Sequence, residues 1–123
     1  MIACAFVIPG DIGLPTGGYE YDRQVLALLP ASGVAVRHVA LPGSFPDPGP
    51  ADLAETGRVL AALPASTVLL IDGLAYGAMP AEIIARIRQP IVALCHHPLA
   101  LEAGISLAEQ ARLRRSERDA LAH

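Results

Sequence analysis

The chain has 123 residues, the size of a single domain, and its formal net charge of −3 argues against a surface built to bind nucleic acid. Hydrophobic residues make up 53% of the sequence and aromatic residues only 4%. Aliphatic side chains must therefore fill the core, as they do where helices cover a parallel sheet.

Apolar and amphipathic segments alternate from the N-terminus onward. Residues 2–8 form a continuous apolar run, which predicts a strand buried on both faces. After a Gly-rich loop, a 3.6-residue pattern predicts a helix over residues 19–29, with Tyr21, Val25 and Leu29 on one apolar face. The remaining elements are strands over residues 34–41, 67–71 and 91–95, helices over residues 51–63 and 81–88, and a last helix that a capping box at Ser106 opens and that reaches Leu121.

The βαβαβαβα order predicts an α/β fold with a doubly wound, Rossmann-like parallel sheet. We expect the common strand order 3-2-1-4, in which the first and fourth strands are neighbours at the switch point. Cys4 and Cys95 would then lie on neighbouring strands, both as reduced core thiols of a cytoplasmic protein. No apolar run approaches the ~18 residues of a membrane span, and the basic residues are all Arg, as codon bias in a GC-rich, bacterial genome would give.

Three unusual segments follow predicted strands. They are the Gly-rich loop that ends in Gly17-Gly18, the Asp72-Gly73 pair, and His96-His97-Pro98. Ligands of doubly wound sheets bind beyond the carboxyl ends of the strands, where the strand order reverses. We therefore expect the Gly-rich loop and the histidines to face one crevice.

Each segment allows two interpretations. Gly17 and Gly18 can present helix N-terminal amides to a phosphate, or can simply form a turn; their spacing matches neither the dinucleotide nor the P-loop motif. His96 and His97 are adjacent on an extended segment, so their side chains diverge and do not chelate one metal together. Since no carboxylate stands at a zinc-like spacing, no metal site is expected.

Three further residues are candidates for substrate binding. Asp72 and Glu102 could bind an acceptor hydroxyl, although an Asp in the position of Asp72 commonly caps the following turn. Tyr19 lies in the first turn of the first helix, next to Glu20 and Asp22. That acidic pair is explained by its favourable interaction with the helix dipole.

The motifs together resemble the amino-terminal domain of glycosyltransferase family 4, over essentially the whole chain. The segments that carry the resemblance are Pro15-Thr16-Gly17-Gly18-Tyr19, Tyr21-Asp22-Arg23, Leu41-Pro42-Gly43-Ser44-Phe45-Pro46, Asp72-Gly73-Leu74 and His96-His97-Pro98-Leu99. These enzymes have the GT-B fold, in which two Rossmann-like domains face each other across a cleft. The resemblance implies that residues 1–123 are the acceptor-side domain and that the donor-binding, carboxyl-terminal domain is absent.

The resemblance also implies roles for individual residues. Gly17 and Gly18 match the glycines that lie against the donor diphosphate. His96, with His97 as the alternative, matches the histidine that contacts the donor sugar near the reacting centre. The family uses a nucleotide sugar as co-substrate and needs no metal, so no cofactor is expected, and the acceptor is a sugar or a lipid-linked molecule. No nucleic acid or transmembrane segment is expected, peripheral membrane contact stays open, and this chain alone should be inactive.

Two other functions remain as alternatives. The chain could be a stand-alone nucleotide-binding or regulatory module without catalysis. It could also belong to another enzyme with the GT-B fold, such as a sugar-phosphate epimerase or a phosphorylase.

Overall fold

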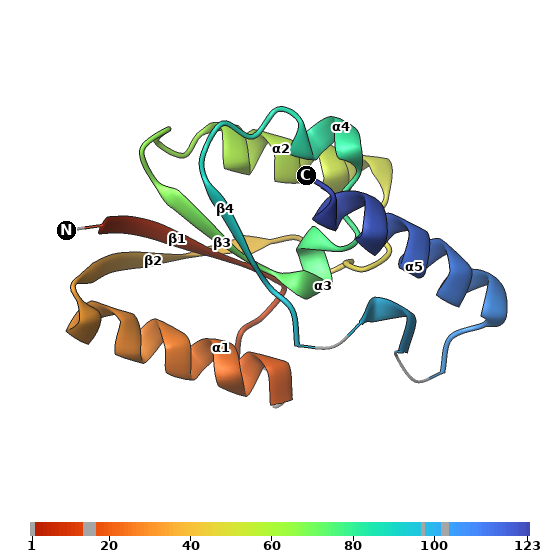
Figure 1. Cartoon of the computed structure of the whole chain (residues 1–123), viewed down its shortest axis with the longest axis horizontal. Coiled ribbons are helices and arrows are strands. Elements are labelled where there is room, and N and C mark those ends of the chain that lie inside the picture. The colour runs from red at the N-terminus through yellow and green to blue at the C-terminus, as the bar shows by residue number, and fades with distance from the viewer. Residues whose placement is uncertain (1, 14–16, 97, 102–103) are drawn as a thin grey trace.

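The computed structural model describes residues 2–13, 17–96, 98–101 and 104–123. At its centre lies a four-stranded, all-parallel sheet (Figure 1). Its strands are β1 (Ile2–Pro9), β2 (Val34–Leu41), β3 (Val68–Asp72) and β4 (Ile91–Leu94). The α/β class and the parallel sheet are as predicted, and β2 has the predicted bounds.

The predicted strand order 3-2-1-4 is wrong. The order is β2-β1-β3-β4, so β3 separates β1 from β4, and Cys4 pairs with Val36 on one side and Val68 on the other. Burial explains this order. Leu69 and Ile71 of β3 are fully buried, as a central strand requires, whereas β2 carries the polar pair Arg37-His38, which suits a sheet edge. The strand order therefore reverses between β1 and β3, as in flavodoxin-like sheets.

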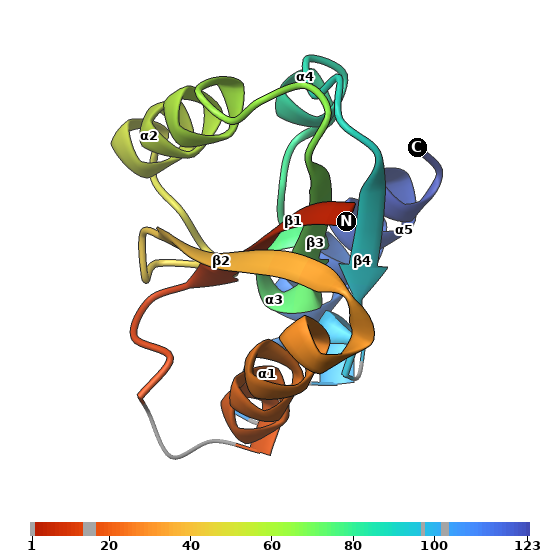
Figure 2. The same ribbon diagram turned by 90° about the vertical axis from the view of Figure 1, so that its left-hand side faces the viewer.

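Helices cover both faces of the sheet. The helix α1 (Gly17–Leu28), continued by a 3₁₀ turn η1 (Leu29–Ser32), lies on one face, and α2 (Pro50–Ala61) and α4 (Ala81–Ile84) lie on the other (Figures 1 and 2). The remaining elements are α3 (Gly73–Tyr76), a 3₁₀ turn η2 (Leu99–Leu101) and α5 (Leu107–Leu121). The Ser106 side chain caps α5 by accepting a hydrogen bond from the Glu109 backbone N–H, as predicted.

Two predicted helices differ in detail. The helix expected over residues 81–88 is a single turn, because Pro90 disfavours the helical conformation in the residue before it. In α1 the predicted apolar face is out of register: Tyr21 is exposed, while Tyr19 and Asp22 are buried.

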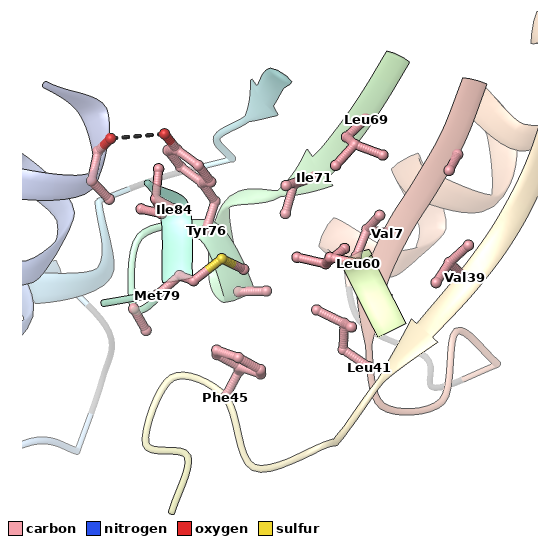
Figure 3. Close-up of a cluster of buried hydrophobic side chains, with 14 of the residues drawn as sticks. Val7, Val39, Leu41, Phe45, Leu60, Leu69, Ile71, Tyr76, Met79 and Ile84 are labelled. Carbon is pink, nitrogen blue, oxygen red and sulfur yellow. Dashed lines mark hydrogen bonds between the residues drawn. The ribbon is translucent and has the colours of Figure 1, made fainter. Parts of the chain in front are cut away.

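Aliphatic side chains dominate the larger core cluster, as the composition predicts. Figure 3 shows Val7 and Ile71 from the two central strands beside Leu60 of α2 and Ile84 of α4. The Tyr76 hydroxyl donates a 2.8 Å hydrogen bond to the backbone carbonyl of Ala120, which ties α3 to α5 (Figure 3). This layer holds the carboxyl ends of β1, β3 and β4 in fixed positions.

The two cysteines are free thiols in different environments. Cys4 is buried in β1, but Cys95 is exposed, so the expectation that both lie in the core is wrong for Cys95. The reason is that β4 ends at Leu94 on the edge of the sheet, and the chain leaves the sheet at Cys95.

Gly73 links β3 to α3 at a point where the chain after β4 passes closely. A Cβ atom at this position would lie 3.1 Å from both the Cys95 Cα and the Leu94 backbone oxygen. Both are backbone atoms next to a paired strand, so they cannot move aside easily. We expect Gly73→Ala to lower the free energy of unfolding by about 1–3 kcal/mol, the usual range for overpacking.

Gly57 provides the matched control for this substitution. It lies inside α2, and no atom lies within 4 Å of its would-be Cβ. Gly57→Ala should therefore stabilise the protein by about 0.5–1 kcal/mol through helix propensity. Urea denaturation of both variants measures the two effects; a Gly73→Ala protein as stable as wild type would contradict the close approach.

Candidate functional site

The N-terminus of α1 and the segment after β4 meet beyond the carboxyl ends of the strands. A Cβ atom on Gly18 would lie 3.3 Å from His96 Cδ2, so the imidazole lies against a position without a side chain. The structure thus brings the Gly-rich loop and His96 together although β1 and β4 are not neighbours. They meet because α1 packs across the sheet as far as Leu70 of β3 and Leu94 of β4.

His96 is held by two carboxylates from different elements. Its Nε2 atom lies 3.1 Å from Asp22 Oδ1 and 3.3 Å from Asp72 Oδ2. Asp22 comes from the second turn of α1, and Asp72 is the last residue of β3. The side chain of His96 is 24% exposed, whereas that of Asp22 is 0% exposed, so the histidine covers the carboxylate.

The environment of Asp22 favours its protonated form. Burial, and then the hydrogen bond and negative charge of Asp72, raise the pKa of Asp22 to about 8. Its Oδ2 atom is buried and has no hydrogen-bond partner among the described residues. Two buried carboxyl groups side by side cannot both ionise without a neighbouring positive charge or a shared proton.

Asp72 caps a helix and contacts the histidine at the same time. Its Oδ1 atom accepts a 2.8 Å hydrogen bond from the Leu74 backbone N–H at the start of α3, while Oδ2 faces His96. The capping interpretation is therefore confirmed. One oxygen fixes the orientation of the carboxylate, and the other is directed at the site.

Two tyrosines of α1 flank this cluster on different sides. Tyr21 is half exposed, and its ring meets the His96 ring edge to face with the centroids 5.5 Å apart. Tyr19 is buried, and its hydroxyl donates a hydrogen bond to the Pro9 backbone carbonyl. Burial, and then the nearby negative charge of Asp72, raise the pKa of Tyr19. This placement favours a supporting role for Tyr19, beneath the surface of the site.

Not every sequence candidate can be located. Gly17 is the first residue of α1, beside Gly18, and Asp72 is in the cluster. His97 and Glu102 lie outside the described residues.

Asp22 is the member of the cluster that the sequence analysis passed over. It was explained by the helix dipole, but its carboxylate lies on the buried face of α1, where it is fully buried between Tyr19 and Val25 in sequence. The available signal was the spacing of these three residues at i, i+3 and i+6, which places a carboxylate within an apolar stripe.

A separate hollow lies on the other face of the protein. It measures about 480 Å³ and lies between α2 and α4, where Leu53, Gly57, Ile83 and Gln89 are among its lining residues. It contains no carboxylate, histidine or cysteine, and none of the predicted site residues. We therefore place the candidate site at His96, where titratable groups converge.

Neither family models, curated proteins nor solved structures gave a match to this chain. None of the helices in the described residues has the length and apolar character that crossing a lipid bilayer demands. The structure itself shows an α/β domain with a four-stranded parallel sheet, an arrangement with which a Rossmann-like fold agrees.

Proposed function

We propose that this chain is the acceptor-side domain of a nucleotide-sugar-dependent glycosyltransferase with the GT-B arrangement. The observation that supports the proposal is the meeting of Gly18, Asp72 and His96 beyond the carboxyl ends of the strands. Such a place binds ligands in doubly wound sheets, and the motifs of the sequence resemble glycosyltransferase family 4 at these positions. A second, donor-binding domain would complete the enzyme.

In this proposal the N-terminus of α1 receives the donor diphosphate. The helix begins at Gly17 and has no side chain in its first two positions, so a phosphate can approach the backbone N–H groups. The positive end of the helix dipole then stabilises the negative charge that grows on the diphosphate as the bond to the sugar breaks.

His96 takes the position beside the reacting sugar. Asp22 and Asp72 hold its Nε2 atom and thereby fix the plane of the ring, which leaves Nδ1 as the ring nitrogen directed away from these carboxylates. A hydrogen bond from a ring fixed in this way costs little reorganisation during transfer. The acceptor, a sugar or a lipid-linked molecule, would approach from the cytoplasmic solution or from a membrane surface.

Binding of nucleotides to the chain tests this proposal. We expect the 123-residue chain to bind nucleoside diphosphates and nucleotide sugars only in the millimolar range and to transfer no sugar, because one helix N-terminus offsets little of the cost of association. Two-dimensional NMR titration, in the presence of a chelator, should show shifts that concentrate on the amides of Gly17, Gly18 and His96.

The distribution of the shifts decides the outcome. Shifts spread around the α2/α4 hollow, or none at Gly17 and Gly18, would overturn the assignment of the diphosphate site. Micromolar affinity would contradict the two-domain proposal and favour the alternative of a stand-alone nucleotide-binding module. Gly18→Ala, whose added Cβ would press on the His96 ring, should abolish the shifts, whereas Gly57→Ala should not.

A further inference from the structure

Three potential metal ligands converge at the candidate site from distant parts of the sequence. Asp22, Asp72 and His96 each offer one ligand atom, and these atoms all lie within 4.8 Å of one another. The sequence gave no reason to expect this set, because the carboxylates come from α1 and β3 rather than from the neighbourhood of the histidine.

The spacing of these atoms is that of ligands around one ion. Metal–ligand bonds of about 2.1 Å place neighbouring ligand atoms about 3.0 Å apart in an octahedron and about 3.4 Å apart in a tetrahedron. The two distances from His96 Nε2, 3.1 Å to Asp22 and 3.3 Å to Asp72, fall in this interval.

A second observation is independent of the distances. Asp22 Oδ2 is buried without a hydrogen-bond partner among the described residues, and the Asp22 side chain as a whole is fully buried. An orphaned carboxylate oxygen is costly in a protein interior, and an unseen ion is one of the standard explanations for such an atom. Here the orphaned oxygen belongs to the side chain that already faces the histidine.

We propose that Asp22, Asp72 and His96 bind a divalent transition-metal ion, such as Zn²⁺ or Mn²⁺. One imidazole and two carboxylates suit these ions better than Mg²⁺, which prefers oxygen ligands and retains its waters. The Leu74 N–H that fixes Asp72 supplies the outer hydrogen bond that oriented metal ligands usually have. Three protein ligands leave coordination positions open.

This proposal is independent of the glycosyltransferase proposal. It departs from the metal-independent chemistry that the family resemblance implies, and it concerns the binding of the ion alone. Because the nucleotide titration is carried out with a chelator, either proposal can fail while the other stands.

Isothermal titration calorimetry of the chain with Zn²⁺, Mn²⁺ and Mg²⁺ tests the proposal. We expect one Zn²⁺ per chain, weaker Mn²⁺ and no detectable Mg²⁺. Asp22→Asn should weaken Zn²⁺ binding by more than about 10-fold, the lower end of what even outer-shell partners cost. In wild type, Zn²⁺ should also raise the melting temperature, and this rise should vanish in Asp22→Asn, which reports on the site in the folded protein.

Two control variants exclude other ligands. Cys95 is an exposed thiol next to His96, and His38 is an exposed histidine on β2. Cys95→Ser and His38→Ala should bind Zn²⁺ as wild type does. The proposal is overturned if wild type binds no Zn²⁺ at one equivalent, if Asp22→Asn binds it unchanged, or if Cys95→Ser abolishes binding.

Discussion

Replacing Asp22 by Asn is expected to make the protein more stable, relative to wild type, as the pH rises. In the folded state the pKa of Asp22 is raised from 3.8 to about 8, chiefly by burial and then by Asp72. The folded protein therefore binds this proton more tightly than the unfolded chain does. The stabilisation that results is complete below about pH 4, where an unfolded Asp titrates, and it is lost as the pH rises through about 8.

Asn is neutral at every pH, so the variant does not undergo this loss. Between pH 5 and pH 9 the free energy of unfolding of Asp22→Asn should rise against that of wild type by at least about 1.4 kcal/mol, the equivalent of one pKa unit. Asp72, His96 and Tyr19 face Asp22 and are present in both proteins, so the comparison isolates the Asp22 carboxyl and its coupling to them.

Urea denaturation at pH 5, 7 and 9, with a chelator present, measures this difference. The exposed Asp119 of α5 is the matched control, since Asp119→Asn removes one carboxylate from the surface and should follow the wild-type pH profile. Profiles of Asp22→Asn and wild type that run parallel would mean that the buried carboxyl group is ionised throughout this range.

The strands and helices were largely predictable from local patterns, whereas the strand order was not. The continuous apolar run of β1 and the run of β2 each predict a strand at nearly the observed bounds. The order depends on which strand tolerates an edge. Arg37 and His38 in β2 and the exposed Val92 in β4 mark those two strands as edges, and weighing them would have placed β3 at the centre.

The site was predictable in part, for a similar reason. Gly18, Asp72 and His96 follow strands of one parallel sheet, so their carboxyl-end positions bring them near one another whichever order the strands take. Asp22 was not predicted because it lies within a helix, where one residue of error in the apolar face turns a side chain by about 100°. Placing Tyr21 on that face made Asp22 appear exposed.

Replacing His96 is expected to have the largest effect on activity in the proposed two-domain enzyme. His96→Ala should lower turnover by about 10²–10³, by analogy with the loss of one hydrogen-bond donor that acts on the transition state. It also leaves Asp22 and Asp72 side by side without the imidazole, so part of any loss could come from the fold. His96→Gln separates the two effects, because a Gln amide can still reach both carboxylates but has no second ring nitrogen.

His96→Gln should therefore retain most of the wild-type thermal stability and still lose turnover to the same extent. His38→Ala, at an exposed position on the edge strand β2, is the matched control and should keep both. For His97, which lies outside the described residues, we expect His97→Ala to lower the melting temperature and leave turnover per folded molecule nearly unchanged. A stable but inactive His97→Ala protein together with an active His96→Gln protein would show that the neighbouring histidine faces the sugar. His96 would then serve only to bridge the two buried carboxylates.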